Sequence, residues 1–404
     1  MLDTIKEVFM RSIRKKLLLA LFLTVVQGVA DAQIVEIPDP NLRAAIEAEL
    51  GKTAGDVITV ADMETLRWLS SYDANISDLT GLEAATQMMD LYLYESPVSD
   101  LSPLAGLTQL TGLYFGGNAI ADLTPLSGLT NLIYLQLYDN LVTDLTPLSG
   151  LTNLGDLDLT DNNIVDISAL ANLTNLTSLG LSWNHIVDLS PLAGLTNLTS
   201  LELSPNSIAD ISALANLTNL TVLDLASNDI VDISALANLT NLKVLELDWN
   251  HSITDISPVA NLINLTELLI NGNSITDISA LTNLTNLTVL WLSDNSITDI
   301  SPVANLTNLT ELLIRNNPIA DISVLCPLIE QNPELDLDIE IDCDPSKELP
   351  ATQVDINSDG VVNILDLVSV ASMFGNVGDN LSADVNGDGV VNILDLVAVA
   401  GQFQ

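Results

Sequence analysis

A phrase of 22 residues repeats along most of this chain, and this period constrains the fold more than any other feature. One copy occupies residues 154–173 and reads LGDLDLTDNNIVDISALANL. An asparagine marks the same point of successive copies, 22 residues apart except for 23 between Asn250 and Asn273. The marker residues are Asn118, Asn140, Asn162, Asn184, Asn206, Asn228, Asn250, Asn273, Asn295 and Asn317. Ser96 marks an earlier degenerate copy, and residues 66–78 form a still weaker one. Such a period predicts a solenoid, because one unit cannot bury its apolar face without stacking on its neighbours.

Each copy also predicts its own local structure. Leu157 and Leu159 alternate with polar residues, so both are expected to point inward from a short strand. Each repeat then adds one strand to a parallel sheet, and about a dozen strands at ~4.8 Å give an arc of roughly 55 Å. The marker asparagine is expected to donate its amide to backbone carbonyls at the following turn, so that stacked copies form a ladder.

The segment after each turn is too short for a long helix. In residues 190–195 the sequence reads SPLAGL, which places Ser190 as a helix N-cap and Pro191 at the first helical position. We therefore expect a single 3₁₀ or α turn per repeat on the convex side.

These phrases resemble known families. The pattern L-x-x-L-x-L-x-x-N-x-I resembles leucine-rich repeats, and I-x-D-I-S-x-L-x-x-L-T-N-L is similar to the 22-residue repeats of the internalin family of bacterial surface proteins. Residues 37–46 and 58–66 resemble that family's N-terminal cap. The resemblance implies an α/β leucine-rich-repeat solenoid, with a parallel sheet and short 3₁₀ turns, that binds proteins. The expected parts are a cap at 33–80, repeats at 81–325, a C-terminal cap at 326–344 and a linker at 345–353.

The cap sequence itself predicts a helix. Asp39 stands at its N-cap, Pro40 at its first position and Gly51 at its end. One face of this helix would cover the open edge of the first repeat with Leu42, Ala45, Ile46 and Leu50.

Residues between the inward leucines should form the concave surface. Eight of the fifteen aromatic residues fall there: Tyr92, Tyr94, Tyr114, Tyr134, Tyr138, Trp183, Trp249 and Trp291. Leu269 and Leu313 join them, with acidic residues interleaved: Asp139, Asp156, Asp158, Asp161, Glu202, Asp224, Glu246, Asp248, Glu267 and Glu311. Exposed aromatics within a charged rim are the usual composition of an interface hot spot. We predict that Tyr92, Tyr114, Tyr134, Trp183, Trp249 and Trp291 contact a protein partner. The alternative is scattered substitution at solvent-facing positions.

A second ladder of carboxylates follows the marker asparagines: Asp100, Asp122, Asp144, Asp166, Asp188, Asp210, Asp232, Asp255, Asp277, Asp299 and Asp321. Each stands beside a Ser or Thr, which favours a local turn or cap. A ladder of calcium ions is the alternative, because stacked carboxylates repel one another unless they share cations.

Two calcium loops occupy the C-terminal part of the chain. Oxygen ligands stand at loop positions 1, 3, 5, 9 and 12, a backbone carbonyl is offered at position 7, and a glycine allows the turn at position 6. The predicted ligands are Asp355, Asn357, Asp359, Val361, Asn363 and Asp366, then Asp384, Asn386, Asp388, Val390, Asn392 and Asp395. Two complete copies predict two bound Ca²⁺ ions.

The loops resemble type I dockerin modules over residues 354–404. The shared features are Asp at position 12, the 29-residue offset between the loops and a single helix after each. The resemblance implies a small all-α module of paired EF-hand-like loops, calcium-dependent folding and docking to a cohesin-like receptor. The sequence departs from cellulosomal dockerins where partners are recognised, with Ile364-Leu365 and Ile393-Leu394 in the loops.

Charge and termini bound the remaining possibilities. A formal net charge of −42 makes nucleic acid a poor partner, since phosphate binding needs clustered Lys and Arg. A basic stretch at 11–16, an apolar run at 17–26 and Ala30-Asp31-Ala32 predict a signal peptide over 1–32, cleaved near Ala32, and hence a secreted or surface protein. No later segment has the length and apolarity of a membrane span. Cys326 and Cys343 can bridge in an oxidising compartment, but sequence cannot test their geometry.

The sequence shows no enzyme motif. His185 and His251 are its only histidines, and neither a nucleophile elbow nor a zinc-protease or phosphate-loop pattern occurs. We therefore expect a non-enzymatic binding protein, tethered to a scaffold or cell surface through the calcium module. The alternative is a structural adhesion or matrix component whose calcium module only stabilises the C-terminus.

Overall fold

The computed structural model describes residues 33–72, 75–341, 343, 370 and 371. The predicted signal peptide, linker and calcium loops lie outside these residues. The chain divides into two compact units, residues 1–340 and 341–404, and the fold described here is that of the first. Among the described residues, no helix has both the length and the apolarity to cross a membrane.

The N-terminal cap is built as its sequence predicts. Helix α2 (Pro40–Glu49) has Asp39 as its N-cap, and Gly51 follows it in the left-handed region at φ +63°. Helix α3 (Val60–Met63) begins with a capping box between Thr59 and Asp62. Leu42 and Ile46 are fully buried, and α2 packs on the first strand.

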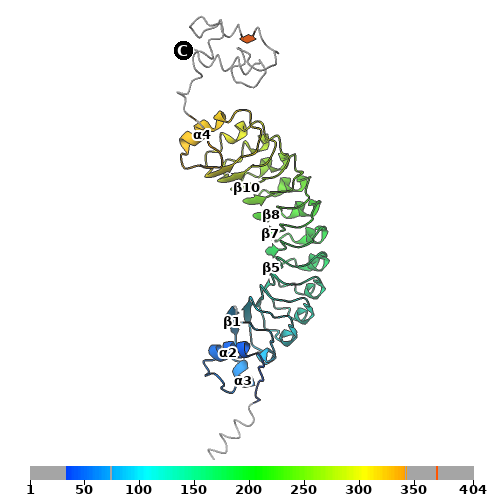
Figure 1. The fold of residues 1–404 in the computed structure, drawn as a ribbon. Helices are drawn as coiled ribbons and strands as arrows, with labels where there is room; N and C mark the ends of the chain where they lie inside the picture. Colours follow the sequence, from blue (N-terminus) through cyan, green and yellow to red (C-terminus); the bar gives the residue numbers. More distant parts are fainter. Residues whose placement is uncertain (1–32, 73–74, 342, 344–369, 372–404) are drawn as a thin grey trace, which may run out of the picture. The chain divides into compact units, whose positions relative to one another are not determined.

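Behind this cap, the described residues form one parallel sheet of 13 strands in sequential order. Figure 1 shows the strands on the inner side of the curved first unit and the 3₁₀ turns on its outer side. The strands are β1 (Trp68–Tyr72), β2 (Asp90–Tyr94), β3 (Gly112–Tyr114), β4 (Tyr134–Gln136), β5 (Asp156–Asp158), β6 (Ser178–Gly180), β7 (Ser200–Glu202), β8 (Val222–Asp224), β9 (Val244–Glu246), β10 (Glu267–Leu269), β11 (Val289–Trp291), β12 (Glu311–Leu313) and β13 (Asp336–Leu337). The weak copy at 66–78 therefore supplies a true strand, β1, which pairs with β2.

Each described repeat turns back through a short 3₁₀ helix, as predicted. These are η1 (Leu82–Ala84), η2 (Ser102–Leu104), η3 (Thr124–Leu126), η4 (Thr146–Leu148), η5 (Ser168–Asn172), η6 (Ser190–Gly194), η7 (Ser212–Asn216), η8 (Ser234–Asn238), η9 (Ser257–Asn261), η10 (Ser279–Leu281), η11 (Ser301–Val303) and η12 (Ser323–Leu325).

The aspartate ladder caps these turns. Asp188 Oδ1 accepts the backbone N–H of Ser190 at 2.8 Å, and the same bond recurs from Asp100 to Asp321. The local-cap interpretation is confirmed. The assignment of Ser190 as N-cap is wrong, because η6 begins at Ser190 itself and the aspartate two residues earlier satisfies its N–H. Hydrogen bonds from Ser168 and Ser212 hold the pKa of Asp166 and Asp210 below the usual range.

The marker asparagines bind two repeats together. Asn162 donates Nδ2 to the carbonyls of Leu159 and Thr160 in its own turn and to Leu137 in the preceding repeat, at 2.9–3.2 Å. Its Oδ1 accepts the N–H of Val142 at 2.9 Å. The predicted ladder is thus confirmed, and it also reaches backward across the repeat boundary.

The ladder changes at the single 23-residue spacing, between Asn250 and Asn273. Asn273 donates to the carbonyls of Leu247, Ile270 and Asn271, as its counterparts do. Its Oδ1, however, is the one buried side-chain polar atom without a partner among the described residues. Ser252, which follows its marker Asn250 by two residues as Val142 follows Asn140, donates its N–H to the Asn250 carbonyl at 2.8 Å instead of to the next marker.

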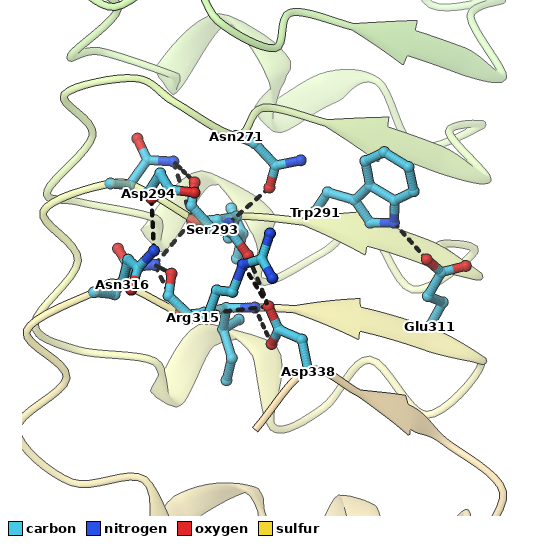
Figure 2. A network of polar contacts seen from close by, with 12 residues as sticks. Asn271, Trp291, Ser293, Asp294, Glu311, Arg315, Asn316 and Asp338 are labelled. Carbon is cyan, nitrogen blue, oxygen red and sulfur yellow. Dashed lines mark hydrogen bonds and ion pairs between the residues drawn. The ribbon is translucent and has the colours of Figure 1, made fainter. Parts of the chain in front are cut away.

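The far end of the sheet is closed by α4 (Cys326–Gln331) and β13, which pairs with β12. Both cysteines, Cys326 and Cys343, are disulfide-bonded. Asp338, just beyond β13, accepts the backbone N–H groups of Ile314 and Arg315 and the hydroxyl of Ser293 at 2.8–3.1 Å (Figure 2). These bonds fasten the closing segment to the last two complete repeats.

Candidate binding surface

Unshifted strand register aligns side chains across the whole concave face. The third strand positions pair in sequence from β2 to β12, so their side chains form one line, which we call the central column. Its members are Tyr92, Tyr114, Gln136, Asp158, Gly180, Glu202, Asp224, Glu246, Leu269, Trp291 and Leu313. The column is therefore aromatic at one end, acidic in the middle and apolar at the other.

The aromatic end is broader than the sequence predicts. We define the aromatic patch as Trp68, Tyr72, Tyr92, Tyr94, Tyr114, Tyr134 and Tyr138 on and beside β1 to β4. Tyr92 and Tyr114 stack with ring centroids 4.3 Å apart. Tyr72 stacks on Tyr94 at 4.9 Å, and Tyr94 lies 6.2 Å from Tyr138.

Two glycines make room for these rings. A Cβ at Gly112 would meet the ring of Tyr114, and one at Gly116 would meet the ring of Tyr138. The Tyr114 ring therefore lies against Gly112 of its own strand, and the Tyr138 ring lies against Gly116 of the preceding repeat. The Tyr94 hydroxyl donates to Gln136 Oε1 at 3.1 Å. Burial, and then the neighbouring Tyr72, raises the pKa of Tyr94 to about 12.

Sequence reasoning missed Trp68 and Tyr72, which are 50% and 65% exposed. The usable signal was the weak repeat at 66–78. Extending the strand register one copy upstream sets Trp68 opposite Asp90 and Tyr72 opposite Tyr94.

The middle of the column is acidic, and we call Asp158, Glu202, Asp224 and Glu246 the acidic column. None of these four carboxylates belongs to an ion pair among the described residues. Asp158 lies over Gly180, where a Cβ would meet its Oδ1. Burial raises the pKa of Asp224 to about 6, despite a hydrogen bond from the N–H of Ala226. Burial, and then the charge of a neighbouring acid, also raises the pKa of Glu202 and of Glu246.

Asp248 lies two residues beyond the column and is buried. It accepts the backbone N–H of Asn271, yet burial raises its pKa to about 7. Asn271 in turn accepts the N–H of Ser293 at 2.8 Å, and Figure 2 shows this bond beside the Asp338 cluster.

The apolar end comprises Leu269, Trp291 and Leu313 on adjacent strands. Trp291 Nε1 donates to Glu311 Oε1 at 2.8 Å, which fixes its half-buried ring on the sheet (Figure 2). A rigid aromatic side chain beside aliphatic ones can contact a partner with little further loss of entropy.

The six residues predicted to contact a partner fall into two groups. Tyr92, Tyr114, Tyr134 and Trp291 lie in strands, whereas Trp183 and Trp249 lie in the turns that follow β6 and β9. Both turn tryptophans adopt positive φ, +55° and +57°, and are 64% and 47% exposed. Trp249 lies across Gly272 of the next repeat. They therefore line the edge of the concave face rather than its centre.

In the described part of the chain, no group of three or more His, Cys, Asp or Glu side chains is placed to hold a metal ion. The calcium loops at 355–366 and 384–395 lie outside that part. Their fit to Ca²⁺ therefore rests on the donor set, six oxygen positions per loop of the kind that Ca²⁺ prefers.

Comparison with known proteins agrees with this architecture. The family model for leucine-rich repeats, which describes two copies at a time, matches this chain at residues 130–172, 174–216, 218–261, 263–295 and 285–327. An internalin (InlF) from Listeria monocytogenes is 36% identical, covering 76% of this chain and 96% of that one with a TM-score of 0.71. The chain belongs to the internalin family. Internalin C2 (InlC2) from the same organism is 40% identical over 51% of this chain and 91% of its own, with a TM-score of 0.50. None of the curated proteins matches the sequence.

The C-terminal module also has a family. Residues 353–403 match the dockerin type I domain, a family that binds calcium and whose presence implies a cohesin partner. Leucine-rich repeats imply protein ligands, and both kinds of domain are typically non-catalytic. Together with the internalin likeness, they suggest an extracellular or surface protein.

Proposed function

We propose that this internalin-family protein binds a protein partner on its concave face and is attached to a scaffold or cell surface through its C-terminal dockerin module. The observation that carries the first half is the central column. Aromatic side chains stand in register at one of its ends and apolar side chains at the other.

The turn tryptophans support the same conclusion. The position before the marker asparagine has a left-handed backbone, which glycine adopts freely and a bulky residue adopts at a cost of about 1 kcal/mol. Gly117 and Gly272 occupy it in two repeats, whereas Trp183 and Trp249 occupy it in two others. Trp183 is largely exposed and Trp249, although it lies across Gly272, is still 47% exposed, so both leave side-chain surface open and we assign them to partner contact.

The second half of the proposal rests on the dockerin match and the loop chemistry. In each loop, side-chain oxygens at five positions would ligate Ca²⁺, with the backbone carbonyl of Val361 or Val390 as a sixth ligand. The metal would order the module, because a site of this kind does not exist in an unfolded chain. The module would then present its surface to a cohesin-like receptor.

The test uses the full chain as bait against the secreted and envelope proteins of its source, in calcium and in chelator. The triple variant Trp183→Ala, Trp249→Ala and Trp291→Ala should lose a concave-face partner and keep any calcium-dependent one. A matched control, Val187→Ala, Val231→Ala and Ile263→Ala, truncates three exposed residues elsewhere and should keep both. Partner capture that survives the tryptophan variant unchanged would remove the concave face from the proposal.

The tether has its own variant. Asp355→Ala with Asp384→Ala removes the first ligand of each loop and should abolish capture of the calcium-dependent partner, as chelation does. The far-UV spectrum and thermal unfolding of the repeats should stay unchanged. If calcium-dependent capture persists in this variant, the module does not dock. If the variant captures the same partners as the wild type but unfolds at a lower temperature, the module only stabilises the C-terminus.

A further inference from the structure

The concave face shows a charge pattern that its own chain leaves uncompensated. Among the described strands β1 to β12, no Lys or Arg occupies a first or third position, and no ion pair of the described residues involves the acidic column. The ion pairs of the described residues are Arg43–Glu47, Lys52–Asp62 and Arg315–Asp338, and of these only Arg315 borders the face, two residues beyond Leu313 at its apolar end. From Asp158 to Glu246 the column crosses four strand steps, or roughly 19 Å at ~4.8 Å per strand.

The two ends of the face suit the same kind of ligand. Carboxylates surround the aromatic patch, since Asp90 is close enough to Tyr114, and Glu95 and Asp158 close enough to Tyr138, to raise the pKa of those hydroxyls further than burial alone. A tyrosine ring edged by carboxylates attracts a cation through both its π-face and its neighbours' charge. At the other end, half-buried Trp291 and Leu313 stand beside buried Leu269 and offer apolar surface that suits an aliphatic or aromatic side chain.

We propose that the partner's contact segment is an extended, basic stretch of protein. Its Lys or Arg side chains lie along the acidic column, one end rests on the aromatic patch and the other on Leu269, Trp291 and Leu313. This inference rests on the concave-face function proposed above and specifies the chemistry of its partner. From Tyr114 to Trp291 the face spans eight strand steps, roughly 38 Å at ~4.8 Å each. A segment of about twelve extended residues covers that length.

Charge complementarity is the argument for this occupant. Carboxylates held partly out of water, without counter-ions, gain more from an arriving cation than solvated ones do, because the local dielectric is lower. An acidic segment would be repelled along the acidic column, and a neutral one would leave the carboxylates without partners. The whole chain is strongly acidic, so a basic peptide would be attracted to other surfaces as well. The test therefore compares carboxylates on the concave face with carboxylates outside it.

The probe is a synthetic peptide of about twelve residues, roughly 40 Å when extended, that alternates Lys with Leu or Tyr. A peptide with Glu in place of Lys is its counterpart. Binding to the full chain is measured by fluorescence anisotropy at moderate salt. Glu202→Gln, Asp224→Asn and Glu246→Gln together remove three carboxylates from the column. Asp188→Asn, Asp210→Asn and Asp232→Asn remove three exposed carboxylates from the turn ladder and retain each cap acceptor.

The column variant should weaken binding of the basic peptide at least tenfold, and the ladder variant by less than about threefold, since exposed charges at this distance are screened. Equal weakening by both variants would show non-specific attraction and overturn the proposal. So would equal binding of the Glu peptide.

The tryptophan variant keeps this failure separate from failure of the proposed function. If the native partner is lost in the tryptophan variant but retained in the column variant, the concave face binds a partner that is not basic. If both variants retain it, the concave face itself is not the binding site.

Discussion

Because of one extra residue in the repeat array, substituting a marker asparagine by alanine should cost a different free energy of unfolding at Asn162 than at Asn273. Asn162 uses both amide hydrogens and its Oδ1, whereas Asn273 uses its amide hydrogens and leaves Oδ1 without a partner. Each buried hydrogen bond contributes about 1 kcal/mol net, and a buried polar atom without a partner costs about 1–3 kcal/mol. Asn162→Ala should therefore lower the free energy of unfolding by roughly 3 kcal/mol. Asn273→Ala removes the bonds made by two amide hydrogens, worth about 1 kcal/mol each, together with one unsatisfied oxygen, so it should lose only about 1 kcal/mol.

The measurement is urea unfolding of the full chain in excess Ca²⁺, followed by far-UV circular dichroism, with the slopes required to agree between variants. Asn175→Ala is the matched control, because Asn175 makes one exposed bond to the Thr152 carbonyl and should lose less than about 0.5 kcal/mol. Deleting Ser252 restores the 22-residue spacing and should stabilise the chain by about 1 kcal/mol. Equal losses for Asn162→Ala and Asn273→Ala would refute the account of the insertion.

Three further predictions concern the cap, a turn and the acidic face. Asp39 accepts the N–H groups of Asn41, Leu42 and Ser77 and joins the cap to the first repeat, so Asp39→Ala should destabilise by about 3 kcal/mol in urea. Burial alone would raise the pKa of Asp39, but these bonds hold that pKa below its usual range. The contribution of Asp39 to folding stability is therefore complete above about pH 4 and is lost as the pH falls through its lowered pKa in the folded state. Trp183→Gly relieves a left-handed backbone at a largely exposed residue and should raise the free energy of unfolding by about 0.5–1 kcal/mol while weakening partner capture; a loss of stability would mean that the ring packs on the fold. Asp248→Asn keeps an acceptor for Asn271 and removes a carboxylate whose pKa is raised to about 7. The native carboxylate holds its proton more tightly than the unfolded chain does, so wild-type stability falls between about pH 4 and pH 7, and the advantage of the Asn variant should grow by roughly 2 kcal/mol from about pH 5 to pH 8 in thermal or urea unfolding. A pH-independent difference would contradict the assigned titration.

Period and alternation predicted the solenoid, because both express which side chains must be buried. The inward leucines, the strand of each repeat, the 3₁₀ turns and the cap helix all follow from local pattern. The backward bond from Asn162 to Leu137 does not, since it depends on how two repeats stack. The cap at Ser190 was misassigned because Ser and Asp are both good N-caps, and only the backbone shows which side chain accepts the N–H.

The surface was predictable in composition and less so in position. Tyr92, Tyr114 and Trp291 stand in strands because alternation places them there, whereas Trp183 follows its strand and lies at the turn. Tyr72 was missed because its repeat is degenerate. The dockerin module is supported by the family match over residues 353–403, whereas the individual calcium ligands remain predictions from the loop sequences and lie outside the described residues.

The acidic column lowers the stability of the folded chain, which favours a role in binding over a structural one. Glu202, Asp224 and Glu246 pair across three neighbouring strands, and Asp158 stands one strand further on beyond Gly180. The same position holds Tyr, Leu and Trp elsewhere in the array and tolerates them. With a pKa raised to about 6, Asp224 is ionised at neutral pH at the expense of the folded state. A basic partner reverses that balance, since its cations replace the water that burial has removed. Binding should therefore release protons and tighten as the pH rises from about 5 to 8, in step with the ionisation of Asp224. Titration calorimetry of the basic peptide in buffers of different ionisation enthalpy measures that release directly. A peptide that binds the column with no proton exchange at about pH 6 would show that these carboxylates are already ionised without it.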